Sequence, residues 1–265
     1  MQLNILVIGD IVGQPGRKIL EKKLQSFIKE QNIDFCIANG ENAAGGSGIT
    51  VGIANKLFSC DINAITMGDH VWKRKEIYDS LQSEERLLRP ANYSPLAYGK
   101  GHVALKTKTG HTVGIINLLG RVFMKPIDCP FRAADLAIEE LSKLTNIIIV
   151  DMHAEATSEK IAMGWYLDGK VSAVVGTHTH VQTADEKIFP KGTGYITDLG
   201  MTGPHESILG RRVDCVLKSI VTQVPVRYDI AEKDLRIEGV IISVNGETGK
   251  TENIKRVKIT ENGHD

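Results

Sequence analysis

The amino-acid sequence predicts a layered α/β domain whose central sheet begins with parallel strands. Short continuous apolar segments alternate with longer segments whose apolar residues recur at helical spacing, which predicts strands connected by helices. The composition agrees, because 42% hydrophobic and 24% charged residues in a chain of 265 are typical of a globular protein with a large core. No linker, low-complexity segment or internal repeat is visible, so we expect one domain over residues 1–265, with room for a small cap within it.

The first half of the chain carries the clearest alternation. Residues 3–8 are a continuous aliphatic run that ends at Gly9-Asp10, the pattern of a strand buried on both faces. Residues 17–30 place their apolar side chains on one helical stripe. Two further strand–helix pairs are expected, at 35–38 with 51–58 and at 64–67 with 75–81.

The second half of the chain is richer in strands and turns. Residues 102–106 and 112–118 are expected to be two strands around a turn at Thr109-Gly110. The apolar run 147–150 predicts a strand followed by Asp151-Met152-His153. The other expected elements are helices at 132–144 and around 158–162, strands at 171–175, 224–230, 235–244 and 253–259, and turns at 245–246 and 248–249.

Charge and cysteine content exclude several classes of protein. The 32 basic residues balance 32 acidic ones, so there is no electrostatic case for extended nucleic acid or an anionic membrane as partner. Four widely spaced cysteines without a CxxC pair indicate neither a disulfide scaffold nor a thiolate zinc site. No apolar stretch approaches the roughly 20 residues of a membrane helix, and no signal peptide is visible, so we expect a cytoplasmic protein.

Five strand-like segments end in side chains that can bind a metal ion. In α/β sheets, ligands bind beyond the carboxyl ends of the strands, so these side chains are expected in one crevice. Carboxylates mixed with imidazoles favour manganese, iron, zinc or nickel over calcium or magnesium. Two adjacent dications would also need shared anionic ligands. The candidates are Asp10, Glu41, Asp69 with His70, His153, and His178 with His180.

Each candidate also has a structural explanation when it is considered alone. Asp10 could be a helix N-cap, and Glu41 with Asn42 could make loop hydrogen bonds. His153 could be a satisfied core histidine. His178-Thr179-His180 is more specific, because alternation puts both imidazoles on one face of an extended segment. The coincidence of these residues at successive strand ends therefore favours a metal site.

These motifs together resemble the calcineurin-like metallophosphoesterases. They resemble most closely the bacterial YmdB-type branch, regarded as 2′,3′-cyclic nucleotide phosphodiesterases. The resemblance covers nearly the whole chain and implies a metallophosphoesterase-type sandwich, with two central β-sheets flanked by helices. It rests on Gly9-Asp10, Gly40-Glu41-Asn42, Gly68-Asp69-His70, His153 and GTHTH at 176–180, with the flanking strings NGENAAGGSG, ITMGDHVWKRKEI, DMHAEATSEK and LGMTGPHESILG.

The resemblance also implies a role for each motif residue. Two divalent transition metal ions are expected, iron or manganese, with zinc as an alternative. His70 would stand beside the scissile phosphate, where it stabilises charge or protonates the leaving oxygen. The implied ligands are Asp10 and His180 for the first ion with Asn42 as a further ligand, Glu41 as a bridge, and Asp69, His153 and His178 for the second ion.

The implied reaction is phosphodiester hydrolysis by a metal-activated hydroxide. Two dications would lower the pKa of a bridging water, and the hydroxide would attack phosphorus in line with the leaving sugar oxygen. The expected partner is a small phosphodiester or cyclic nucleotide, and we expect a homo-oligomer. No Walker A lysine motif is visible, and GDIVGQPG stands where GxGxxG would mark a dinucleotide-binding fold, which argues against those two classes.

Three positions depart from the family pattern, and a fourth departs only from that of the broad superfamily, whose histidine this branch lacks. Asp69 stands where the family has the asparagine of GNH, and Lys73 stands where the branch usually has an acidic residue. Val12 replaces a histidine of the broad superfamily, and His205 replaces a tyrosine. The first two departures favour an alternative function, a noncatalytic metal- or nucleotide-binding regulatory protein on the same fold. A nuclease acting on short oligonucleotides is a third alternative.

Residues that select the substrate are harder to find in the sequence. Asn92-Tyr93, Arg121 and a loop at 202–205 could approach a phosphoester or a base. Each of them is explained equally well as an ordinary loop position.

Overall fold

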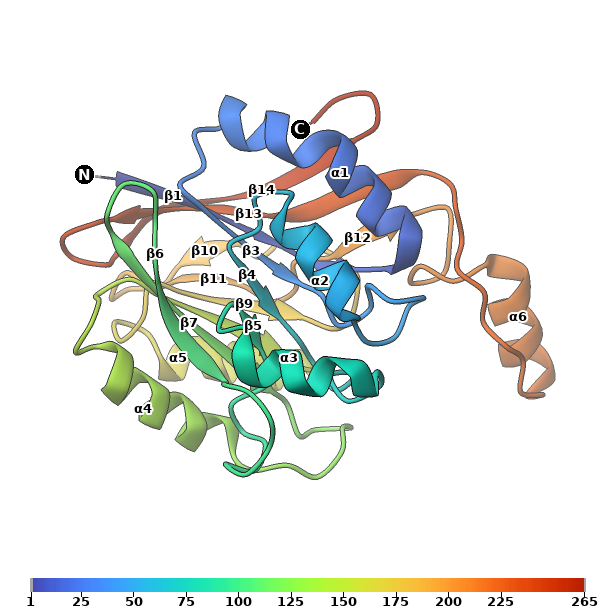
Figure 1. The fold of residues 1–265 in the computed structure, drawn as a ribbon, viewed down its shortest axis with the longest axis horizontal. Helices are drawn as coiled ribbons and strands as arrows, with labels where there is room; N and C mark the ends of the chain where they lie inside the picture. The colour runs from blue at the N-terminus through green and yellow to red at the C-terminus, as the bar shows by residue number, and fades with distance from the viewer. Residues whose placement is uncertain (1, 265) are drawn as a thin grey trace.

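A computed structural model, which describes residues 2–264, contains two β-sheets packed face to face between helices (Figure 1). The eight-stranded sheet has the order β2-β12-β13-β1-β3-β4-β5, with β14 paired to β13. Its strands are β1 (Gln2–Ile8), β2 (Asp10–Ile11), β3 (Phe35–Asn39), β4 (Ala64–Thr66), β5 (Leu87–Leu88), β12 (Met201–Pro204), β13 (Leu235–Asn245) and β14 (Thr251–Thr260). The predicted arrangement of two central β-sheets flanked by helices is thereby confirmed.

The six-stranded sheet has the order β10-β11-β9-β8-β7-β6. Its strands are β6 (His102–Lys106), β7 (Thr112–Leu119), β8 (Ile148–His153), β9 (Ala173–Thr177), β10 (Lys187–Ile188) and β11 (Gly194–Ile196). Strands β7, β8, β9 and β11 run parallel to one another. In the other sheet β1, β3, β4 and β5 are also parallel, as the strand–helix alternation predicted. Each sheet therefore presents a row of carboxyl strand ends.

Helices cover the outer faces of both sheets. On the eight-stranded sheet lie α1 (Gly13–Glu30), α2 (Val51–Phe58) and α3 (Tyr78–Ser83), the last preceded by a 3-10 turn at Lys75–Ile77. On the six-stranded sheet lie α4 (Pro130–Leu141) and α5 (Thr157–Tyr166). Helix α6 (Val213–Thr222) projects from the body of the molecule (Figure 1). Between residues 2 and 264, no helix is long and apolar enough to cross a membrane.

Three apolar layers hold the sandwich together, and β1 shows why its sequence is continuously aliphatic. Leu6 and Ile8 pack toward the helices of the eight-stranded sheet. Ile5 and Val7, on the opposite face of β1, pack between the two sheets. All four side chains are buried, and burial of each contributes about 1.5–3 kcal/mol. A third layer lies between the six-stranded sheet and helices α4 and α5.

Two predictions about the C-terminal third are wrong. Residues 224–230 were expected to form a strand, but only Ile230 makes an isolated bridge, to Arg211. Val224 is exposed and Pro225 lacks a backbone donor, so this β-prone segment has no neighbouring strand to pair with. Residues 202–205 were expected to be a loop, whereas β12 extends through Pro204 and Thr202 is completely buried.

Candidate metal centre

Strand ends from both sheets meet at one edge of the sandwich. The end of β1 leads into β2, and the ends of β3 and β4 lie beside it in the same sheet. The ends of β8 and β9 come from the six-stranded sheet. These ends bring into one connected cluster Asp10 in β2, Glu41 and Asn42 after β3, Asp69 and His70 after β4, His153 at the end of β8, and His178 and His180 after β9.

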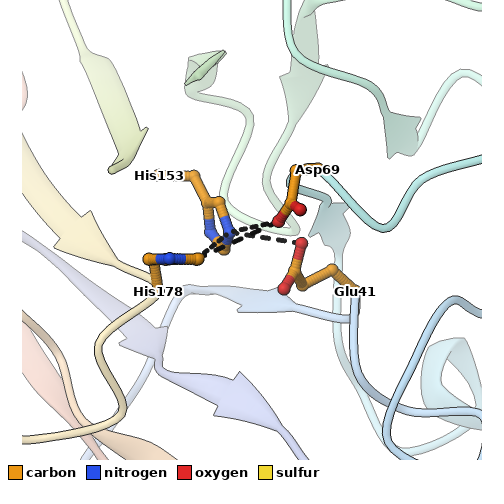
Figure 2. A group of neighbouring side chains, drawn as sticks. All are labelled: Glu41, Asp69, His153 and His178. Atoms are coloured by element: carbon orange, nitrogen blue, oxygen red, sulfur yellow. Dashed lines mark hydrogen bonds and ion pairs between the residues drawn. The ribbon is translucent and has the colours of Figure 1, made fainter. Parts of the chain in front are cut away.

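Four of these side chains, Glu41, Asp69, His153 and His178, form a first donor group, whose donor atoms lie within 4.8 Å of one another (Figure 2). His153 Nε2 is central to the group. It lies 3.2 Å from Glu41 Oε2 and 3.7 Å from Asp69 Oδ1, and 3.0 Å from His178 Nδ1. Glu41 and His153 are buried, whereas Asp69 and His178 are partly exposed. The group is therefore accessible from one side and could hold a metal ion.

Asp10, Asn42 and His180 form a second donor group beside the first. His180 Nε2 lies 3.8 Å from Asp10 Oδ1 and 3.2 Å from Asn42 Nδ2. Asn42 Nδ2 also donates a hydrogen bond of 3.0 Å to Glu41 Oε1. Glu41 therefore contacts both groups, one with each carboxylate oxygen. Because the amide NH₂ of Asn42 faces His180, ligation through its oxygen would require the amide to turn over.

His178 and His180 do not lie on one face of an extended segment, so that prediction is wrong. Strand β9 ends at Thr177, and the backbone is left-handed at His178, with φ of 99°, and at His180, with φ of 63°. Such φ values cost about 1–3 kcal/mol each in residues other than glycine. The turn directs His178 to the first donor group and His180 to the second.

Buried negative charge dominates the electrostatics of the cluster. Burial raises the pKa of Asp10 to about 8, against the opposing effect of His153. Burial alone would lower the pKa of His153, but the carboxylates around it outweigh this effect and raise its pKa well above the ordinary value. Burial would raise the pKa of Glu41, but His153 and His70 bring it well below its ordinary value. Protons thus balance part of the carboxylate charge, and a divalent cation could replace them.

Two buried carboxylate oxygens, Asp10 Oδ1 and Asp69 Oδ1, have no hydrogen-bond partner within residues 2–264. A buried oxygen without a partner costs about 1–3 kcal/mol. Asp69 Oδ1 faces His153 in the first donor group, and Asp10 Oδ1 faces His180 in the second. Each group therefore combines a carboxyl oxygen that has no hydrogen-bond partner with imidazole nitrogens, a donor set suited to transition metals. The residues fit the metal centre that the resemblance implies.

His70 lies where the two donor groups meet. Its Nδ1 is 2.9 Å from Asn42 Oδ1 and 3.2 Å from Glu41 Oε1. Hydrogen bonding to Glu41 raises the pKa of His70, against the opposing effect of burial. The two acceptors beside Nδ1 keep a proton on that nitrogen, so Nε2 is left for another partner. Among the described residues, Nε2 makes no hydrogen bond and lies 4.0 Å from Asp69 Oδ2, so it is available to a bound molecule.

The residues that orient His153 were not predicted from the sequence. Its Nδ1 lies 2.8 Å from Thr177 Oγ1, and the Thr177 hydroxyl donates to Asp151 Oδ1 at 2.7 Å. Asp151 Oδ2 accepts from Thr66 Oγ1 at 2.5 Å and from Asn39 Nδ2 at 3.2 Å. Such partners fix a histidine tautomer and leave Nε2 for a cation. A signal was available, because Asp151 and His153 are two residues apart on a strand and share a face.

Sequence similarity to known proteins shows the family to which the chain belongs. A family model described as YmdB-like protein matches residues 6–257. The chain belongs to the YmdB-like family. It is 47% identical to a Bacillus subtilis protein named 2′,3′-cyclic-nucleotide 2′-phosphodiesterase, over 98% of each chain.

Two solved structures that are 39% and 30% identical to this YmdB-like chain share its whole fold. One is a hypothetical protein from Thermus thermophilus, with 39% identity and a TM-score of 0.91 over 98% of this chain and 100% of that one. The other is described as a novel phosphatase from Mycoplasma pneumoniae, with 30% identity and a TM-score of 0.91 over 98% of this chain and 94% of that one.

The positions that depart from the YmdB-type pattern, or from that of the broad superfamily, lie in different places. Asp69 is inside the first donor group, so its extra carboxylate adds charge there. Lys73 is exposed and lines a cavity beside Asp69. The ring nitrogens of His205 face groups outside the donor set, with Nε2 3.3 Å from the Met201 carbonyl oxygen and Nδ1 3.8 Å from Glu238 Oε1. Val12 is buried and supplies no donor atom to the cluster. Only Asp69 and Lys73 are therefore placed to affect a reaction at the donor groups.

Asn92 has a structural role in this YmdB-like chain. It is buried, and its Nδ2 donates to the carbonyl oxygens of Leu119, at 2.7 Å, and Asp128, at 2.9 Å. These bonds tie Asn92 to the end of β7 and to the segment before α4, and they use both N–H groups of its side-chain amide. Tyr93, the next residue, lines the cavity beside Asp69. Arg121 is exposed.

Proposed function

We propose that this chain is a metal-dependent phosphodiesterase that hydrolyses 2′,3′-cyclic nucleotides or related small phosphodiesters. Two divalent transition metal ions would bind in the two donor groups. The name of the Bacillus subtilis relative, at 47% identity over 98% of each chain, supports the substrate class. The mixture of carboxylate and imidazole donors supports iron or manganese, with zinc as the alternative.

One observation carries this proposal, namely that two adjoining donor groups share Glu41. Each group contains one buried carboxylate oxygen without a hydrogen-bond partner in residues 2–264. Glu41 contacts His153 in the first group through Oε2 and Asn42 in the second through Oε1. A shared anionic ligand between two groups is what two adjacent dications require, because it offsets their repulsion.

The side chains of this cluster would have separate roles in hydrolysis. Asp69, His153 and His178 would hold one ion and Asp10 and His180 the other, with Glu41 between them. When bound, the ions supply Lewis acidity, which lowers the pKa of water and neutralises charge on phosphate oxygens. Holding His178 and His180 in a strained turn keeps their nitrogens in place before a cation arrives.

His70 is proposed to assist the leaving group. Glu41 and Asn42 engage its Nδ1, which fixes the ring and turns Nε2 toward bound substrate. In the imidazolium form, Nε2–H can donate a proton to the departing sugar oxygen. His70 is not one of the proposed metal ligands. Its loss is therefore expected to lower the rate of hydrolysis more than it lowers the affinity for metal.

The experiment is an assay of 2′,3′-cyclic AMP hydrolysis with Mn²⁺ or Fe²⁺. We expect turnover in the wild-type protein that His153→Ala or His178→Ala abolishes, while His102→Ala, distant from the cluster, leaves it unchanged. No turnover under any of these conditions would contradict the proposal. A silent wild type that gains activity on Asp69→Asn would instead favour the noncatalytic alternative, because Asp69 is the departure inside the donor group.

A further inference from the structure

A cavity of about 310 Å³ lies beside the first donor group. Asp69 belongs to both, so the cavity borders the place where the proposed reaction occurs. Its volume is at the lower end of the range for small-molecule sites, about 300–1,000 Å³. A larger cavity, of about 970 Å³, lies between β6 and α4 and includes none of the donor residues. The smaller cavity is therefore better placed for part of a substrate held at the donors.

The inner wall of this cavity is aromatic and well supported. Trp72 and Tyr93 meet edge to face, with ring centroids 5.4 Å apart. Tyr78 packs against Trp72 in the same way at 5.6 Å, and its hydroxyl donates to the Trp72 carbonyl oxygen. Because these contacts already immobilise the rings, a flat ligand that packs on them costs little side-chain entropy. Flat heteroaromatic rings, such as nucleobases, suit such a surface.

The rim of the cavity is basic. Lys73 and Lys125 both line it, and both are exposed. None of the ion pairs within residues 2–264 includes either lysine. Ammonium groups without a carboxylate partner attract anionic ligands, and they bind phosphate oxygens through charge-assisted hydrogen bonds. An aromatic wall and a basic rim together fit a ligand with one flat apolar part and one anionic part.

We infer that this cavity binds the nucleoside part of the substrate. The nucleobase packs against Trp72 and Tyr93, and Lys73 and Lys125 contact a phosphate group of the same nucleotide. The inference rests on the proposed function and adds to it the residues that select nucleotides over other phosphodiesters. Asp69, which belongs to the first donor group and also lines the cavity, then lies between the bound base and the other donor residues.

Tryptophan fluorescence tests the base site directly. The chain has two tryptophans, and the other one, Trp165, is 55% exposed on α5. In Trp165→Phe, emission therefore reports on Trp72 alone. Adenosine 3′-monophosphate should quench this emission saturably in the Mn²⁺-loaded protein, whereas inorganic phosphate should not. The matched variant Trp72→Phe should show no quenching. Calorimetric binding of the nucleotide without any change in Trp72 emission would overturn the inference.

Charge substitutions test the rim. The double variant Lys73→Ala/Lys125→Ala should bind adenosine 3′-monophosphate about tenfold more weakly, and its affinity should depend less on salt. The control Lys106→Ala/Lys143→Ala removes the same charge from exposed lysines outside this cavity and should bind as the wild type does. Unchanged affinity in the first variant, or an equal loss in the control, would overturn the inference.

These measurements separate this inference from the proposed function. Quenching of Trp72 without any hydrolysis of 2′,3′-cyclic AMP would support the nucleotide site while the proposed function failed. Hydrolysis with an unchanged KM in Lys73→Ala/Lys125→Ala and no quenching in Trp165→Phe would overturn the site while the proposed function stood. A base-free ribose 2,3-cyclic phosphate should have a higher KM than the nucleotide, and an equal KM would count against the site.

Discussion

Lys160 and Asp198 form a completely buried ion pair, with Lys160 Nζ donating to Asp198 Oδ2 at 2.7 Å. The same oxygen accepts from the backbone N–H of Thr179 at 3.1 Å and from its hydroxyl at 2.7 Å. Thr179 lies between the two histidines whose backbones are left-handed. The ion pair therefore anchors the strained turn that directs one histidine to each donor group.

The first prediction concerns stability. Lys160→Met leaves the Asp198 carboxylate buried without its cation, so the free energy of unfolding should fall by about 3–5 kcal/mol. Urea denaturation of the metal-free protein measures this. Lys170→Met is the matched control, because Lys170 forms a half-exposed pair with Asp135, and it should cost less than about 1 kcal/mol. Equal losses in the two variants would contradict the anchoring role.

The second prediction concerns metal binding. Thr179→Val keeps the shape of the side chain and the backbone N–H but removes the hydroxyl that donates to Asp198. With less to hold the turn, Mn²⁺ affinity measured by calorimetry should fall about 10-fold or more, as it does when supporting residues of metal ligands are changed. Thr222→Val, at the end of the projecting helix α6, should leave the affinity unchanged. If both variants bind Mn²⁺ like the wild type, the turn does not depend on this hydroxyl.

The third prediction concerns the unusual carboxylate at position 69. Asp69→Asn removes one negative charge from the first donor group while keeping an oxygen donor. The metal-free protein should melt at a lower temperature, because the variant loses the attraction to His153 and His70 that lowers the pKa of the Asp69 carboxyl group against the effect of burial. The increase in Tm that saturating Mn²⁺ produces should become smaller, because weaker binding stabilises less. A larger increase in the variant would show that Asp69 does not face the ion.

The fourth prediction concerns pH. The pKa of Asp10 is raised to about 8 in the fold by burial, above its ordinary value of 3.8. A carboxyl group with a raised pKa favours the folded state while it is protonated, so this contribution falls as pH rises from about 3.8 to about 8 and is gone above that. The metal-free protein, kept in chelator, should therefore lose Tm as pH rises toward about 8, and this part of the decline should level off above it. Asp10→Asn should remove this part of the decline; an identical decline in both proteins would contradict the assignment.

The sequence predicts those parts of the fold that depend on local pattern. The aliphatic run of β1 identifies a strand buried on both faces, because alternate residues such as Leu6 and Val7 meet different apolar layers. The position of Glu41 just after a strand indicates the edge where the donors gather, because parallel strands place their carboxyl ends together.

Features that depend on tertiary contacts were not predicted. The left-handed backbone at His178 is stabilised by Asp10, which accepts from the His178 N–H, and by Asp198, which accepts from the Thr179 N–H; both carboxylates are distant in the chain and give no local signal. The hydroxyl of Thr177 connects His153 to Asp151 across two strands. Residues 224–230 have a β-prone sequence but no partner strand, so propensity alone was misleading there.

The central claim is that two metal ions act together in donor groups that share Glu41. Its most direct test is a titration of metal-free protein with Mn²⁺, in which bound metal and 2′,3′-cyclic AMP hydrolysis are measured on the same samples. We expect two bound ions per chain, with hydrolysis appearing as the second ion binds. Full activity with one bound ion, or two bound ions without any hydrolysis, would contradict it.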